Sequence, residues 1–246
     1  IVNPLPEIEL YGDELICSNN PLFTKVINAG LLDETTISSF TYQWFLDGSI
    51  ISTATNYDLT VNTEGIYTVE VTNSSGCKRT RTITVTASDI ATINDVEIVD
   101  LSDENSVTVL VSGLGNYEFS LDNIAYQSSN VFQNIASGIY TVYVRDLNGC
   151  GVATEEISVL GIPNYFTPNG DGYNDYWNVK GVNSNFNLET TIHIFDRYGK
   201  LLKQISPLSQ GWDGTFNGVQ MPSSDYWYSI QLEDGRILKG HFSLKR

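Results

Sequence analysis

The sequence predicts an all-β chain made of three tandem β-sandwich modules of Ig-like character. Short runs that alternate apolar and polar residues follow one another along the 246 residues, and Gly, Asn and Asp separate them. No window keeps apolar residues at helical spacing over several turns. A segment that recurs after 73 residues indicates the length of one module.

The first module is expected at residues 1–87. Residues 42–45 alternate and Asp47-Gly48 follows them, which is a strong hairpin signal. Trp44 lies in this alternating run, so we expect it in the core. The opening residues Ile1–Leu10 resemble an interdomain linker stiffened by two prolines, and we expect the chain to be a segment of a longer protein.

The second module is expected at residues 88–160, because the segment Gly65–Cys77 recurs as Gly138–Cys150. Both copies contain Gly-Ile-Tyr-Thr-Val, a further Val and a final Gly-Cys at matching places. Alternation predicts strands at Val107–Val111, Tyr117–Leu121 and Ile139–Val144.

The third module is expected at residues 161–246. Tight turns with glycine are expected at Arg197–Lys200 and Glu233–Arg236. Large side chains must bury enough area in so small a module, so Trp177, Trp212 and Trp227 are expected at core and corner positions. Strands are expected near Asn164–Phe166, Trp177–Val179, Thr191–Phe195, Leu201–Ile205, Tyr226–Leu232 and Ile237–Leu244.

Charge divides the chain near residue 160. The formal net charge is −16, with 5 Lys+Arg and 21 Asp+Glu in residues 1–160 and 8 of each in residues 161–246. Long-range repulsion therefore disfavours a nucleic-acid partner for the first two modules.

The three cysteines lack a C-x-x-C spacing, which argues against zinc and against a redox dithiol. An oxidising compartment would permit a disulfide, and we expect it between Cys17 and Cys77. Cys150 is then left as a small buried apolar residue.

The loop at residues 167–175 is the one stretch whose order indicates site chemistry. Oxygen-bearing side chains alternate with glycines that let the backbone turn sharply, which is the pattern of calcium-binding loops, although the spacing is shorter than an EF-hand and lacks its distal Glu. A plain pair of turns would use the same residue types. We expect a Ca²⁺ site formed by Asn169, Asp171, the carbonyl of Tyr173, Asn174 and Asp175.

The sequence offers little material for catalysis, and no enzymatic activity is expected. The two histidines, His193 and His241, each alternate with apolar neighbours, so both are expected to point outward from strands. The glycines of the 167–175 loop lack the following Lys and helix that would cradle phosphate.

Five stretches together resemble the type B C-terminal sorting domain of type IX secretion cargo: Phe166–Asp175, Ile194–Gly199, Gly211–Thr215, Pro222–Tyr228 and Lys239–Arg246. Within 88–160, Val111–Asp122, Phe132–Ile135 and the Gly-Ile-Tyr-Thr-Val strand resemble the SprB-type repeat of gliding adhesins, on a shorter pattern.

The resemblance implies export to the outer cell surface. The last module would be recognised by the type IX translocon and by an outer-membrane β-barrel partner of the SprF/PorP kind, and upstream modules would form a stalk that contacts a surface glycan or substratum. The residues expected to dock, by strand addition or pocket insertion, are Leu238, Lys239, Gly240, His241, Phe242, Lys245 and Arg246.

An alternative is open at this stage. The chain could be the non-catalytic tail of a secreted hydrolase, or a carbohydrate-binding module with Trp212 and Trp227 as sugar-stacking platforms.

Overall fold

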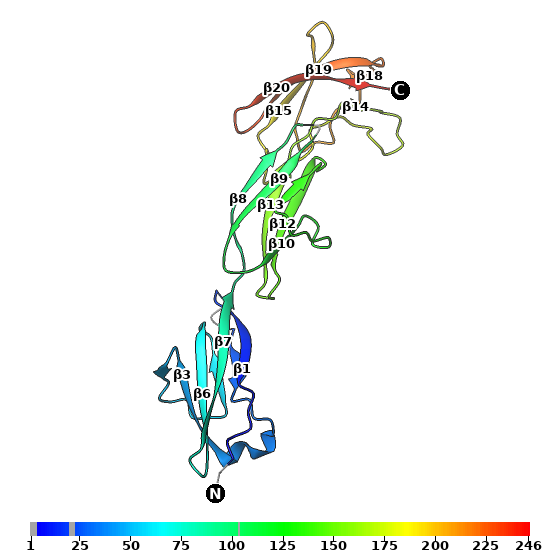
Figure 1. Ribbon diagram of the computed structural model, residues 1–246. Coiled ribbons are helices and arrows are strands. Elements are labelled where there is room, and N and C mark those ends of the chain that lie inside the picture. The colour runs from blue at the N-terminus through cyan, green and yellow to red at the C-terminus, as the bar shows by residue number, and fades with distance from the viewer. Residues whose placement is uncertain (1–3, 20–22, 103) are drawn as a thin grey trace.

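The computed structural model describes residues 4–19, 23–102 and 104–246. Figure 1 shows an elongated arrangement in which the modules follow one another from the N end to the C end. Apart from one short 3-10 segment, η1 (Glu34–Ser39), the regular elements of these residues are strands. The prediction of an all-β chain of tandem sandwich modules is confirmed.

The first module packs two sheets around Trp44, which is fully buried. One sheet has the order β1-β7-β6-β3-β4, and β2 pairs with β5 in the other. Ile8 is 5% exposed and belongs to this core, so the expected linker ends before it; residues 1–3 of that linker lie outside the described residues. The strands are β1 (Tyr11–Cys17), β2 (Lys25–Asn28), β3 (Phe40–Leu46), β4 (Ser49–Ile50), β5 (Asp58–Val61), β6 (Gly65–Asn73) and β7 (Lys78–Ser88).

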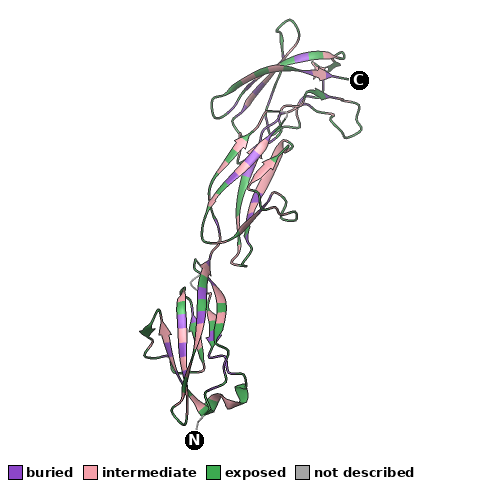
Figure 2. Cartoon of the chain, in the orientation of Figure 1, coloured by how far each residue is buried: buried purple, intermediate pink, exposed green. Residues whose placement is uncertain are grey.

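The second module packs the sheet β10-β12-β13 against the sheet β11-β9-β8. Buried valines on both sheets form most of its core. Figure 2 shows buried stretches on the strands of this module. Each copy of the recurring segment forms the first strand and turn of a hairpin, β6–β7 in one module and β12–β13 in the next. The strands are β8 (Thr92–Val99), β9 (Ser106–Ser112), β10 (Tyr117–Ser120), β11 (Val131–Gln133), β12 (Gly138–Asp146) and β13 (Val152–Val159).

The third module is built on the sheet β14-β20-β19-β15-β16, with the small hairpin β17–β18 beside it. Trp177, Trp212 and Phe242 are buried between this sheet and the loops that cover it. One face of β20 therefore packs into the core, and the other face points outward. The strands are β14 (Tyr165–Phe166), β15 (Thr191–Phe195), β16 (Leu201–Ile205), β17 (Thr215–Phe216), β18 (Val219–Gln220), β19 (Ser224–Gln231) and β20 (Ile237–Leu244).

The expected strand Trp177–Val179 is wrong. The chain forms only isolated bridges there, Trp177 with Trp212 and Lys180 with Gly161. Trp177 exchanges two backbone hydrogen bonds of 2.9 Å with Trp212, and its indole Nε1 donates to the carbonyl of Pro163 at 2.8 Å. The segment is fixed by its buried side chain and one bridge rather than by a ladder.

The expected disulfide between Cys17 and Cys77 is also wrong, because the structure joins Cys17 to Cys150. Strand β1 runs parallel to β7, and the register pairs Cys17 with Ser88 at the end of β7. Cys77 precedes the opposite end of β7, so roughly 35 Å of strand separates it from Cys17. A disulfide needs its Cα atoms within about 7 Å, and the Cα atoms of Cys17 and Cys150 are 5.4 Å apart.

Candidate functional site

The loop at residues 167–175 closes on the carboxylate of Asp175. One of its oxygens accepts the backbone N–H groups of Asn169 at 3.0 Å and Gly170 at 2.7 Å, and the other accepts that of Gly172 at 2.8 Å. These bonds hold the pKa of Asp175 below its ordinary value, the Gly170 amide contributing most. The loop therefore bends around one carboxylate.

The remaining expected ligands lie in the same loop. The side-chain amide of Asn169 donates to Asp171 at 2.8 Å, and Asp171 also accepts the N–H of Tyr173 at 2.8 Å. The carbonyl of Tyr173 accepts the hydroxyl of Thr167 at 3.3 Å. Asn174 has a positive φ of 50°, and its carbonyl accepts the N–H of Thr167 at 2.7 Å.

This geometry is a partial fit to a calcium site. Asn169, Asp171 and Asp175 bring side-chain oxygens into one short loop, and oxygen ligands suit a hard cation. Each carboxylate already accepts N–H groups, however, so a cation would share those oxygens. No cluster of three acidic, His or Cys side chains suited to a metal occurs in the described part of the chain.

The terminal strand β20 lies inside the sheet, between β14 and β19. Of the residues expected to dock, Phe242 is fully buried and stacks on Trp177 with ring centroids 3.8 Å apart. Leu238 packs partly against the same core. A Cβ on Gly240 would lie 2.4 Å from the Tyr228 hydroxyl, so the Tyr228 ring covers this glycine. These three side-chain positions face inward and are not a docking surface.

The other expected docking residues are exposed. Lys239 and His241 alternate with the inward residues and project from the opposite face of β20. Lys245 holds its ammonium 4.5 Å from the centre of the Tyr165 ring, and the Arg246 guanidinium donates to the carbonyl of Gly214 at 3.2 Å. The last two residues are thus tied back onto the module.

An aromatic and basic surface forms where β15, β19 and β20 turn their alternate residues away from the core. Phe195 pairs with Trp227, and Trp227 pairs with His241, so the three rings lie side by side across the strands. Lys239 lies one step along β20, and Arg197 follows β15. We call Phe195, Arg197, Trp227, Lys239 and His241 the outer face.

The outer face is open and combines aromatic rings with basic side chains. Trp227 is 40% exposed, and Phe195, Trp227 and Lys239 line a pocket of about 450 Å³. The alternation in residues 191–195 and 224–231 indicates this surface, and the expectation that Trp227 is a core or corner residue is wrong, because its ring lies on the outward side of the sheet. Indole rings are enriched at protein interfaces, where one side is covered and the other can meet a partner.

The sugar platform expected at Trp212 is wrong. This side chain is 1% exposed, it packs edge-on against Tyr226 with centroids 4.9 Å apart, and its Nε1 donates to the carbonyl of Thr215 at 2.7 Å. Both faces of the ring are therefore unavailable to a ligand.

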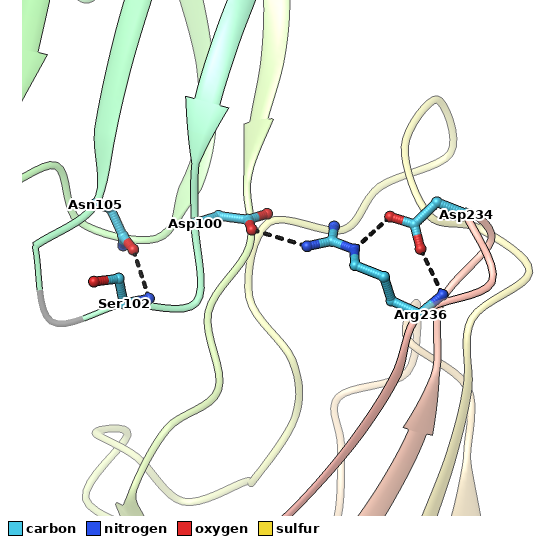
Figure 3. Close-up of polar contacts among 5 residues, drawn as sticks. All are labelled: Asp100, Ser102, Asn105, Asp234 and Arg236. Atoms are coloured by element: carbon cyan, nitrogen blue, oxygen red, sulfur yellow. Dashed lines mark hydrogen bonds and ion pairs between the residues drawn. The ribbon is translucent and has the colours of Figure 1, made fainter.

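The third module is anchored to the second through the β19–β20 turn. The guanidinium of Arg236 contacts Asp100 of the second module at 3.2 Å and Asp234 of its own turn at 2.6 Å, as Figure 3 shows. Nearby, the Ser102 N–H donates to Asn105 at 3.0 Å and shapes the loop that follows Asp100. Glu156 accepts the side-chain amides of Asn183 at 3.4 Å and Asn185 at 3.0 Å. These polar contacts join the third module to the second.

Comparison with known proteins assigns the third module. Residues 160–243 match the CHU_C Type IX secretion signal domain. No curated protein matches the chain. In the part of the chain that the structure describes, no helix has the length and apolar character to cross a membrane.

Solved structures of immunoglobulin-domain chains are similar at low identity. Titin domains I67–I69, in an E-to-A variant, share 12% identity over 98% of this chain and 97% of that chain, with a TM-score of 0.41. The insect immune protein hemolin shares 12% identity over 98% of this chain and 77% of that chain, with a TM-score of 0.43.

Proposed function

We propose that this chain, which carries a type IX secretion signal domain at residues 160–243, is displayed on the outer cell surface and that the signal domain docks through its outer face. The partner is the export machine together with an outer-membrane β-barrel protein of the SprF/PorP kind. The first two modules serve as the stalk of an adhesin that contacts a glycan or substratum.

The observation that carries this proposal is the outward-facing row of Phe195, Trp227 and His241, in which Trp227 and His241 are exposed and Phe195 is half-buried. A module of this size gains most stability by burying its rings, as it does with Trp177 and Phe242. An indole left 40% exposed beside Lys239 has the composition of an interface centre.

The stalk role rests on charge and shape. The first two modules carry the acidic excess of the chain, and each has its own core. Like charge keeps neighbouring copies apart in solution. The modules extend end to end in Figure 1, which suits a spacer between a cell surface and its target.

The test is export of the full chain with substitutions that leave the core intact. Trp227→Ala and Lys239→Glu both change the outer face only. An interface hot spot costs about 2 kcal/mol or more when it is truncated, which is roughly a thirtyfold loss of affinity. In a bacterium with the matching export machine, the double variant is expected to accumulate in the periplasm in folded form.

The matched control is Gln231→Ala, because Gln231 is exposed on the same side of β19 as Trp227 but lies four residues away and is not one of the five outer-face residues. This variant is expected to reach the surface as the unsubstituted chain does. Normal surface display of the double variant would refute docking through the outer face. Deletion of the terminal strand is a poorer test, because it removes Phe242 and Leu244 from the core.

A further inference from the structure

The two half-cystines lie where the first module meets the second. Cys17 ends β1, and the parallel register places it beside Ser88, where the chain leaves the first module. Cys150 lies in the turn between β12 and β13. The disulfide therefore joins the end of the first strand of one module to the turn before the last strand of the next, across a sequence separation of 133 residues.

The turn that carries Cys150 packs against residues 88–91, the linker between the first and second modules. Asn148 donates to the Ser88 hydroxyl at 3.1 Å, and a Cβ on Gly151, whose φ is 144°, would lie 2.8 Å from the Ile90 side chain. The buried carboxylate of Asp146 accepts the N–H of Cys150 at 3.0 Å and fixes the turn from within. The half-cystine thus sits on a braced turn.

The other side of the linker is braced as well. Asn19 donates to the carbonyl of Ile90 at 3.0 Å and accepts the N–H of Ile90 at 3.2 Å. Asp89 accepts the Tyr117 hydroxyl and the N–H of Leu114. Burial and this carboxylate raise the pKa of Tyr117 to about 12. The linker is enclosed by groups from both modules.

The directions of strands β1 and β13 determine how the disulfide transmits force along the chain. β1 ends at Cys17, and β13 starts just after Cys150 and leads to Leu160, which belongs to the core of the third module. A covalent path from the first module to the third therefore runs along β1, across the disulfide and along β13. Both strands already have extended backbone, so tension along this path has almost no slack to draw out.

We propose that the Cys17–Cys150 disulfide makes the first two modules an inextensible tether, in which tension between the chain ends bypasses residues 18–149. Strands β1 and β13 then carry the load along their own backbones, and the other strands of both modules lie outside the force path. This inference goes beyond the proposed function, since it concerns the stalk and holds whether or not the last module directs export.

The size of the effect follows from the connectivity. Without the disulfide, pulling on the ends can unfold both modules and release the chain between Cys17 and Cys150, whose sequence separation of 133 corresponds to about 450 Å of extended chain. With the disulfide, that length is withheld. Unfolding of residues 161–246 releases about 290 Å in either state, so the third module serves as an internal reference in every trace.

Single-molecule force spectroscopy of the full chain tests the proposal, with handles at its two ends. The oxidised protein is expected to show only the reference release, and the same protein in dithiothreitol is expected to show about 450 Å more. Cys150→Ser under oxidising conditions is expected to match the reduced protein. Wild type measured before and after reduction gives the same comparison if that variant fails to fold.

Cys77→Ser is the matched control, because Cys77 is outside the disulfide, and it is expected to behave as wild type. Alkylation followed by mass spectrometry identifies the joined cysteines in the sample that is pulled. Equal released lengths in the oxidised and reduced proteins, or a disulfide between other cysteines, would overturn the proposal.

Discussion

Replacement of Phe242 by alanine tests whether the terminal strand is core or contact surface. Phe242 is fully buried and stacks on Trp177 at 3.8 Å, with Phe166, Trp212 and Tyr226 within 6.3 Å. Truncating a buried Phe costs about 3–5 kcal/mol in all, and the four aromatic contacts of Phe242 place it at the upper end of that range. We expect a loss of about 5 kcal/mol.

That loss is comparable to the whole stability of the third module. A folded unit of this size has a free energy of unfolding of about 4–13 kcal/mol. Hydrogen exchange of peptides from β19 and β20 measures it locally, without overlap from the other modules. A loss of 5 kcal/mol corresponds to exchange faster by roughly three to four powers of ten.

The matched control for Phe242→Ala is Trp227→Ala on the neighbouring strand. Trp227 is 40% exposed on the opposite face of the sheet, so its truncation is expected to cost about 1 kcal/mol or less. If both variants accelerate exchange equally, or if Phe242→Ala changes it less than tenfold, the division of the strand into a core face and an outer face is wrong.

Three further outcomes are expected. The pKa of Asp175 is lowered, so its ionised carboxylate stabilises the folded loop above the ordinary carboxyl pKa of about 4, and this stabilisation is lost as pH falls through the lower pKa of the folded state. Amide NMR should therefore report loop opening only in that acid range. Asp175→Asn should abolish the transition. We propose that the loop binds Ca²⁺, so calcium at a hundredfold excess over Kd should add about 2.7 kcal/mol to the free energy of unfolding. An equal melting temperature in calcium and in chelator would contradict the proposal. So would a variant with Asn169, Asp171 and Asp175 replaced by alanine that melts in calcium as the unsubstituted chain does. Arg236→Ala removes the ion pair with Asp100, so it should lower the free energy of unfolding by under about 1 kcal/mol and widen the distribution of spin-label distances between the second and third modules. An unchanged distribution would show that the pair does not orient the two modules.

Local patterns were enough to predict the fold class and most strands of the third module. β15, β16 and β20 have the expected bounds, because one buried face imposes a period of two on their sequences. The Trp177 segment was beyond this reasoning, since an aromatic residue fixed by one bridge carries the same local signal as one in a strand.

The cysteines that form the disulfide could not be predicted from local sequence patterns. Parallel pairing of β1 with β7 decides which end of the module Cys17 occupies, and the partner Cys150 lies in the next module. The docking residues show a similar limit. Consecutive residues of β20 were grouped together, although alternation sends Phe242 inward and His241 outward.

The core of the third module determines where it can be cut for fusion to another protein. Leu160 is 2% exposed in that core, and Leu101, from the loop after β8, packs against it. A graft that begins at residue 161 leaves behind both leucines and the partner of Arg236. A secretion tag taken from this protein should therefore start before residue 88, so that the signal domain keeps the second module, against which it packs.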